Sequence, residues 1–234
     1  MSWHQRPLAA FDIETTGTDV DTDRIVTAAL WHITPATGHT TVTEWLANPG
    51  IDIPEAATAI HGITTDHAHT HGRPATDVVA EISRTLAHVA NQGQPLVVYN
   101  AAFDLTLLDR ELRRHGHHLP FHGQLRVIDP LVLDKHLDTY RKGSRRLADV
   151  CTHHGIPLPA DQAHGAAADA LAAARLAWKL ATLNPNLSRM DPDTLHHAQT
   201  AWRAHQATSL QDYLRRTKDP QAVVDTAWPL IPHA

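Results

Sequence analysis

The chain has 234 residues, of which 42% are hydrophobic and 19% charged, so global disorder is excluded and one large domain, or one domain with an extension, is expected. Its single cysteine, Cys151, excludes an internal disulfide and a multi-cysteine zinc site. No apolar run approaches the roughly 20 residues of a membrane helix and no signal peptide is apparent, so we expect a cytoplasmic protein without membrane association. With a net charge of −5, an anionic ligand must be held by a local site.

The N-terminal part of the chain predicts three strands joined by short turns. Residues 8–13 are a short, mainly apolar run with a carboxylate, Asp12, near its end. Residues 25–34 and 40–46 are rich in β-branched and aromatic side chains. Residues 35–38, Pro-Ala-Thr-Gly, are a natural hairpin connection. The three strands therefore predict an antiparallel meander.

Helices and strands alternate in the chain that follows, which indicates an α/β domain. Apolar side chains at helical spacing predict a helix between Pro74 and Gly93, and Asn100 is a typical cap for the start of another helix. Two more strands and two more helices are predicted at residues 96–99, 125–128, 144–154 and 166–183. We therefore expect a mixed five-stranded sheet, with the three-strand antiparallel meander plus two further strands, flanked by helices.

The sequence changes in character after Asn184-Pro185-Asn186. Residues 194–216 predict one or two helices, and an irregular tail follows them. A free tether is poor in aromatic residues, whereas this segment contains Trp202, Tyr213 and Trp228. We therefore predict a main domain, residues 1–185, and a helical C-terminal extension, residues 186–234, packed on it. A second copy of the chain or a polymerase is the competing partner for the same apolar side chains.

Asp12 and Glu14 present two carboxylates at the end of the first predicted strand. Residues two apart in a strand point to the same face, so these side chains lie side by side. Like charges this close repel each other unless a cation lies between them or one carboxyl is protonated. The pair indicates a metal site, although acidic residues that merely flank a turn give the same pattern.

Two further segments place acidic side chains near the start of a helix. Asp104 falls in the first turn after Asn100, where a carboxylate is also favoured by the helix dipole alone. Asp169 follows His164 by five residues, a spacing at which two side chains cannot share one face of a regular helix. They converge only if His164 lies in the preceding loop, which suits a mobile base beside a rigid metal ligand.

Four acids on three separated segments, together with one loop histidine, predict an oxygen-rich cluster for Mg²⁺ or Mn²⁺ rather than zinc. In chain order, residues 12–17 (DIETTG), 100–104 (NAAFD) and 164–169 (HGAAAD) resemble the three motifs of the DEDDh 3′–5′ exonucleases. That family includes the proofreading epsilon subunit of bacterial replicative DNA polymerase. The resemblance covers about residues 7–183 and implies an RNase H-like fold.

The resemblance also implies a role for each matching residue. Two Mg²⁺ or Mn²⁺ ions would be held by Asp12, Glu14, Asp104 and Asp169, with His164 as the general base. Ile60 and His61 resemble the family's loop that touches the terminal nucleotide. The substrate-binding residues expected from the resemblance are Thr15, Gly17, Ile60, His61, Asn100 and Phe103.

From these features we expect an exonuclease that hydrolyses phosphodiester bonds at the 3′ end of single-stranded or frayed DNA and releases nucleoside 5′-monophosphates. DNA replication, repair and proofreading are the expected setting, with a DNA polymerase as a candidate partner. RNA or short oligoribonucleotides are the first alternative substrate, because these motifs recur in RNases. A non-catalytic, polymerase-associated subunit is the second alternative, and the intact acid set argues against it.

Two other patterns leave alternatives open. A second, zinc-type site is conceivable at two groups of histidines that we expect in a loop and after a helix: His67, His69 and His71, and His115, His117 and His118. However, histidine is common throughout this chain, which has 20 of them. The basic run 140–146 either holds backbone phosphates or is a solvated loop.

Overall fold

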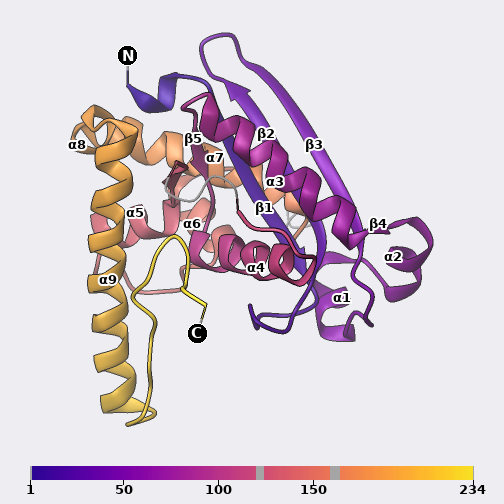
Figure 1. The fold of residues 1–234 in the computed structure, drawn as a ribbon. Helices are drawn as coiled ribbons and strands as arrows, with labels where there is room; N and C mark the ends of the chain where they lie inside the picture. Colours follow the sequence, from indigo (N-terminus) through magenta and orange to yellow (C-terminus); the bar gives the residue numbers. More distant parts are fainter. Residues whose placement is uncertain (1, 120–123, 159–163, 234) are drawn as a thin grey trace.

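A six-stranded mixed sheet lies at the centre of the computed structural model, which describes residues 2–119, 124–158 and 164–233 (Figure 1). The strands are β1 Leu8–Thr15, β2 Ile25–Thr34, β3 His39–Asn48, β4 Arg73–Pro74, β5 Pro95–Val97 and β6 Arg126–Ile128. Their order across the sheet is β4-β3-β2-β1-β5-β6. β1, β2 and β3 pair antiparallel, whereas β5 pairs parallel with both β1 and β6.

The predicted mixed sheet with its antiparallel meander is confirmed, but the sheet has a sixth strand. β4 consists of Arg73 and Pro74 alone and pairs in parallel with Ala47 and Asn48 of β3. Two residues are too few to show an alternation of apolar and polar side chains. The sequence pattern therefore did not predict this strand.

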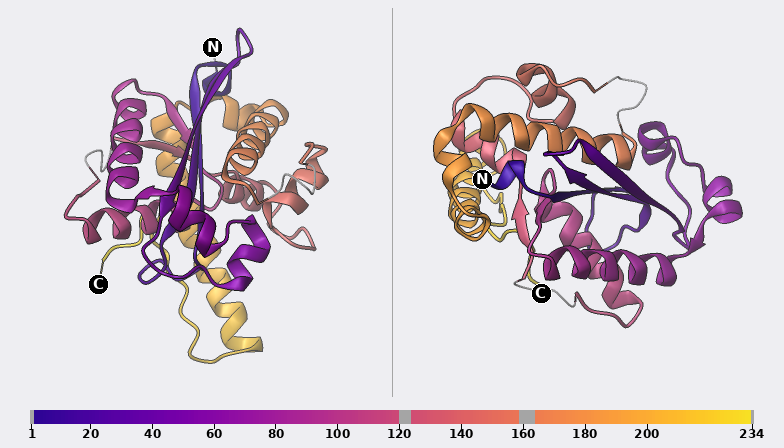
Figure 2. Two further views of the ribbon diagram at one scale, coloured as in Figure 1. Left: turned by 90° about the vertical axis from the view of Figure 1, so that its right-hand side faces the viewer. Right: turned by 90° about the horizontal axis from the view of Figure 1, so that it is seen from above.

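Helices cover both faces of the sheet (Figure 2). They are α1 Glu55–His61, α2 Thr65–His71, α3 Ala75–Asn91, α4 Ala101–Arg114, α5 Pro130–Leu137, α6 Leu147–His154, α7 Ala166–Leu183, α8 Pro185–Arg189 and α9 Pro192–Thr217, and a short 3-10 turn spans Trp3–Gln5. The predicted helices correspond to α3, α4, α6, α7 and α9, and α9 is one continuous helix. The other four helices have five to eight residues and too few turns for a clear apolar period.

β1 separates two apolar cores. Its odd-numbered residues, Ala9, Phe11 and Ile13, pack in the core that contains side chains of α3 and α4. Its even-numbered residues Leu8 and Ala10 belong to the core formed with α5, α6 and α7. The face of β1 that carries Asp12 and Glu14 is therefore the face that α7 covers.

α9 lies along β6, the edge strand of the sheet, and also contacts α5. His196 Nδ1 accepts a hydrogen bond from the backbone N of Val127 at 3.1 Å, and Gln199 Nε2 donates to the Val127 carbonyl at 3.0 Å. Gln199 is fully buried, and its Oε1 accepts from the backbone N of Asp129 at 2.7 Å. Two side chains of α9 thus bind the backbone N–H and carbonyl of Val127, which a further strand of the sheet would otherwise bind.

The structure corrects the expectation for one histidine group. His67, His69 and His71 lie on helix α2 and not in a loop.

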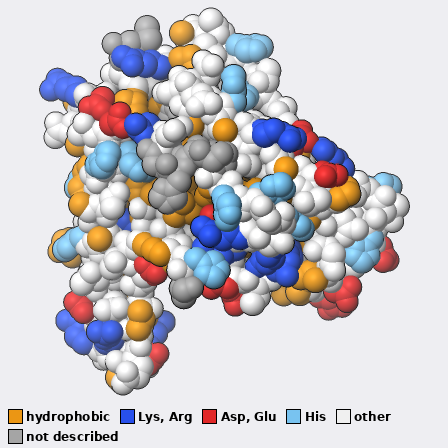
Figure 3. All heavy atoms as spheres, in the orientation of Figure 1, with side chains coloured by type: hydrophobic (Ala, Val, Ile, Leu, Met, Phe, Trp, Pro, Cys, Tyr) orange, Lys and Arg blue, Asp and Glu red, His pale blue; other side chains and the backbone are white. Residues whose placement is uncertain are grey.

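No helix in the described part of the chain is long and apolar enough to cross a membrane. Basic, acidic and histidine side chains are interspersed over the face seen in Figure 3.

Candidate metal centre

The first two carboxylates lie at the C-terminal end of β1, as the sequence predicted. Asp12 pairs with Ala29 and Glu14 with Thr27 of β2, and the register shifts between Glu14 and Thr15. Both acidic side chains are partly exposed, whereas Ile13 between them is buried. The strand therefore presents the two carboxylates together on the side of α7, just before the chain leaves the sheet.

Asp169 joins this pair from the first turn of α7. The indole Nε1 of Trp31 on β2 donates to the Ala167 carbonyl at 2.7 Å, which fixes the start of α7 against the sheet. One carboxylate oxygen from each of Asp12, Glu14 and Asp169 lies within 4.8 Å of the others. Three carboxylates at this spacing match the hard oxygen ligands that Mg²⁺ and Mn²⁺ prefer.

Asp104 reaches the same end of β1 from the first turn of α4. Its Oδ1 accepts a hydrogen bond from the backbone N of Ile13 at 3.2 Å, and the residue is 3% exposed. Because Ile13 lies between Asp12 and Glu14, this bond holds Asp104 next to the other acids. Asp104 is not within the 4.8 Å group itself.

The start of α4 is capped differently from the sequence expectation. Asn100 precedes the helix in a left-handed conformation with φ of 61°, and its side chain makes no capping hydrogen bond. Instead, the buried carboxylate of Asp129 accepts from the backbone N of Asn100 and of Ala101, both at 3.0 Å. Asp129 also accepts from the backbone N of Leu131 at the start of α5 at 3.0 Å. One carboxylate thus satisfies the first donors of two helices.

Burial and mutual repulsion change the ionisation of the cluster. Burial, together with the charge of Asp169, raises the pKa of Glu14 to about 8. Burial raises the pKa of Asp12 well above its ordinary range, with further contributions from Asp104 and Glu14. Burial also raises the pKa of Asp104 and of Asp169. A cation at this position would compensate the charges, so the donor set fits a divalent metal.

His164 lies in the loop before α7, as the spacing required. Its backbone is left-handed, with φ of 68°, and its backbone N donates to Asp169 Oδ1 at 3.4 Å. The residue is exposed, so its ring is accessible to solvent beside the acids. The structure therefore places a histidine next to the carboxylate cluster.

A hollow of about 630 Å³ opens beside Glu14 and His164. Its wall includes His61 and Ile63, together with three residues that the sequence did not indicate, Glu44, Trp45 and Leu46 of β3. The pairing of β3 with β2 brings these three residues near the acids. Thr27 of β2 pairs with Glu14 of β1 on one side and with Leu46 of β3 on the other. The sequence alone could not predict that these residues line the site, because their position depends on the register of the strands.

The other predicted substrate-binding residues lie at or just after the end of β1, at the start of α4 and at the end of α1. Thr15 Oγ1 donates to the Gly17 carbonyl at 2.6 Å in the turn after β1, and a Cβ at Gly17 would lie 2.5 Å from the Asp23 carboxylate. Phe103 is partly buried on α4, and Asn100 is exposed. Ile60, at the end of α1, is 56% exposed. Burial lowers the pKa of the neighbouring His61.

The remaining histidine clusters do not form a second metal site in the described part of the chain. Asp12, Glu14 and Asp169 are the one group of three or more ligand side chains found this close together there. The rings of His67 and His71 are 4.8 Å apart, without a third ligand side chain. His115 contacts Glu111 at 3.3 Å.

The basic run 140–146 has a structural role. Arg141 and Arg145 both bind the buried carboxylate of Asp134, and His154 Nε2 lies 3.0 Å from the same group. Burial alone would raise the pKa of Asp134, but the hydrogen bonds from His154 and Arg145 lower it below its ordinary value. Two of the basic side chains, Arg141 and Arg145, are thus held by Asp134, whereas Lys142 and Arg146 are exposed.

Comparisons with known proteins concern the family and the fold of the chain. The family model described as Exonuclease, RNase_T, matches residues 9–177. A DNA polymerase III subunit epsilon-like protein of Rhodobacter capsulatus is 34% identical over 175 residues, which cover 73% of this chain and 23% of that protein. This chain therefore spans about a quarter of the length of that curated relative.

Solved structures with the same fold include exonuclease I of E. coli in complex with a dT13 oligonucleotide (TM-score 0.65, 19% identity, 88% of this chain and 46% of that chain). Exonuclease I of Methylocaldum szegediense is similar at a TM-score of 0.60 and 21% identity, over 89% of this chain and 46% of that chain. At these identities the similarity concerns the fold.

Proposed function

Because the chain belongs to the RNase_T exonuclease family and is of the DEDDh type, we propose that it is a metal-dependent 3′–5′ exonuclease acting on single-stranded or frayed DNA ends. The observation that carries the proposal is the approach of Asp12, Glu14 and Asp169 within 4.8 Å, with the backbone N of His164 hydrogen-bonded to Asp169. This arrangement combines oxygen ligands for a cation with a nearby side chain that can accept a proton.

Each residue of the cluster has a proposed role. Asp12, Glu14, Asp104 and Asp169 would hold two Mg²⁺ or Mn²⁺ ions, which when bound stabilise the attacking and leaving oxygens of an in-line phosphoryl displacement. His164 would accept the proton of the attacking water, and its exposed position leaves room for that water. The products would be nucleoside 5′-monophosphates.

The hollow beside Glu14 and the turn after β1 are the proposed substrate site. Leu46 and Ile63 give the hollow apolar residues suited to contact a base or sugar. The backbone of Thr15 and Gly17, with the side chains of Ile60, His61 and Phe103, would contact the terminal nucleotide, and Asn100 lies at the same edge. Contacts of this kind do not distinguish one base from another.

The comparisons support DNA as the substrate and a polymerase as a partner. E. coli exonuclease I has been solved with single-stranded DNA, and the Rhodobacter relative is named after a subunit of DNA polymerase III. We therefore propose a cytoplasmic role in DNA replication, repair or proofreading. RNA, the alternative substrate, has no such support and is tested as a separate arm.

A paired digestion tests the proposal. Matched DNA and RNA oligonucleotides, each labelled at the 5′ end in one sample and at the 3′ end in another, are incubated with Mg²⁺, with Mn²⁺ or with EDTA. We expect 3′-labelled DNA to release labelled mononucleotide at once and 5′-labelled DNA to shorten stepwise, with no reaction in EDTA. Asp12→Asn protein, purified in parallel, controls for contaminating nucleases. Faster digestion of RNA, or release from the 5′ end, would contradict the proposal.

A further inference from the structure

Residues 219–233, here called the C-terminal strap, turn back from the end of α9 and run along this helix towards α4 (Figure 1). The backbone N of Val224 donates to Gln211 Oε1 at 3.1 Å, and Arg215 Nε donates to the Ala222 carbonyl at 2.8 Å. The strap contains no helix or strand. A few specific contacts therefore determine its course.

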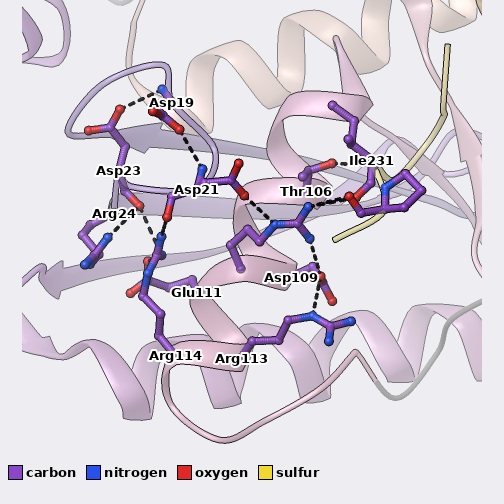
Figure 4. A network of polar contacts seen from close by, with 12 residues as sticks. Asp19, Asp21, Asp23, Arg24, Thr106, Asp109, Glu111, Arg113, Arg114 and Ile231 are labelled. Atoms are coloured by element: carbon purple, nitrogen blue, oxygen red, sulfur yellow. Dashed lines mark hydrogen bonds and ion pairs between the residues drawn. The ribbon is translucent and has the colours of Figure 1, made fainter. Parts of the chain in front are cut away.

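The end of the strap contacts α4 directly (Figure 4). The backbone N of Ile231 donates to Thr106 Oγ1 at 2.9 Å. Arg110 Nη2 donates to the carbonyls of Ile231 and Pro232 at 3.1 and 3.0 Å. Thr106 is fully buried and Arg110 is 5% exposed, so on the α4 side these hydrogen bonds are made by buried side chains.

The opposite side of the same arginine binds the loop that follows β1. Arg110 Nε donates to Asp21 Oδ1 at 2.8 Å, and Arg114 on α4 donates to the carbonyls of Asp21 and Asp23. Figure 4 shows this loop and the strap meeting at α4. The helix is therefore held between the chain that leaves the acid-bearing strand and the C-terminal end of the protein.

A second strap residue acts on the start of α4. Trp228 is 5% exposed, and its Nε1 donates to Asp129 Oδ2 at 3.2 Å. The same Oδ2 accepts from the backbone N of Ala101, the first residue of α4. Trp228 thus fixes the carboxylate that caps this helix.

These contacts lie on both sides of Asp104 in the sequence of α4. The Asp129 cap holds Asn100 and Ala101, which precede Asp104, and the Thr106 contact follows it by two residues. We propose that the C-terminal strap, through Trp228 and Ile231, is a positioning element that keeps Asp104 hydrogen-bonded to Ile13 beside the other carboxylates. The proposal rests on the proposed function in one respect, that Asp104 helps to hold the metal.

Two conservative variants of the full-length protein test the strap. Trp228→Phe removes the indole donor to Asp129 together with part of a buried ring, and Thr106→Val removes the acceptor for Ile231. Trp178→Phe, at an exposed tryptophan of α7, and Thr85→Val, at a threonine of α3 whose hydroxyl bonds within its own helix, are the matched controls. Circular dichroism and thermal unfolding establish that all four proteins fold.

Two measurements are made well below the unfolding temperature: amide hydrogen exchange of residues 101–107 and of Ile13, and Mn²⁺ affinity by electron paramagnetic resonance. We expect both strap variants to exchange faster at these amides and to bind Mn²⁺ more weakly, each by up to about tenfold, which corresponds to the loss of one buried hydrogen bond at about 1.4 kcal/mol. The controls should match the wild type.

The outcomes separate the strap from the proposed function. Exchange and Mn²⁺ affinity equal to those of the controls would overturn the proposal. Faster exchange within α4 without faster exchange of Ile13 would also overturn it, because the strap would then stabilise α4 without positioning Asp104. A wild-type protein that binds no Mn²⁺ would refute the metal site of the proposed function. In that case the exchange rates of Ile13 and α4 would still decide whether the strap holds Asp104.

Discussion

Replacing Glu14 by glutamine should stabilise the metal-free protein at alkaline pH while abolishing its activity. The folded protein raises the pKa of the Glu14 carboxyl from 4.5 to about 8 because burial and the nearby Asp169 charge disfavour its ionised form. At about 1.36 kcal/mol per pKa unit, the ionised carboxylate costs up to about 5 kcal/mol of folding free energy. Water and counterions at the partly exposed side chain reduce this value, so we expect about 2–4 kcal/mol.

The direction in which stability changes with pH follows from the number of protons bound by the folded and the unfolded protein. Between pH 4.5 and about 8 the folded protein keeps the Glu14 proton that the unfolded chain has lost, so stability falls as the pH rises through this window. Below pH 4.5 both states are protonated and the penalty disappears. Glu14→Gln has no proton to lose, so its advantage over the wild type should be small at pH 4.5 and largest above pH 8.

Urea unfolding in EDTA at pH 4.5, 7 and 9 measures this difference directly. Glu44→Gln makes the same chemical change on an exposed side chain of the same hollow and is the matched control. Mg²⁺ should stabilise the wild type at pH 9 and Glu14→Gln much less. A difference between wild type and Glu14→Gln that stays constant from pH 4.5 to 9 would refute the reasoning.

Three further changes have defined outcomes. Asp12→Ala should nearly abolish DNA hydrolysis. Its fold should stay intact by circular dichroism, since removing one acid relieves the repulsion among the carboxylates. Digestion at a near wild-type rate would contradict the metal-site assignment. His164→Gln should lower the rate by roughly 10²–10⁴-fold, the usual contribution of a general base. A rate near that of the wild type would assign the proton to another group. Asp129→Ala should lower the free energy of unfolding by about 3–5 kcal/mol, because four donors lose their acceptor; a urea midpoint near that of the wild type would contradict this role.

The sequence predicted the elements that have a strong period or a clear boundary. The strand Ile25–Thr34 and the helix Ala166–Leu183 were predicted with the bounds that the structure shows. α1 and α2 were missed because each has seven residues and only one buried side chain, Ala57 or Ala68, so they have no apolar stripe. Their stability comes from tertiary contacts rather than from a local pattern.

The candidate site was predictable where its chemistry follows chain spacing. The alternation of side chains along β1 placed Asp12 and Glu14 on one face. The loop position of His164 followed from its spacing of five residues from Asp169 in the sequence. The bond from Ile13 to Asp104 and the capping role of Asp129 were not predictable, because they depend on how β1, α4 and α5 meet in space. The division of the chain near residue 185 stays a prediction.

The contact between α9 and β6 has a consequence for aggregation. An edge strand with free backbone groups is a template on which another chain can add as a new strand. Here His196 and Gln199 occupy the outward N–H and carbonyl of Val127, the middle residue of β6. A chain shortened before α9 would expose this edge, so we expect it to self-associate through β-strand addition even if its acidic cluster were intact.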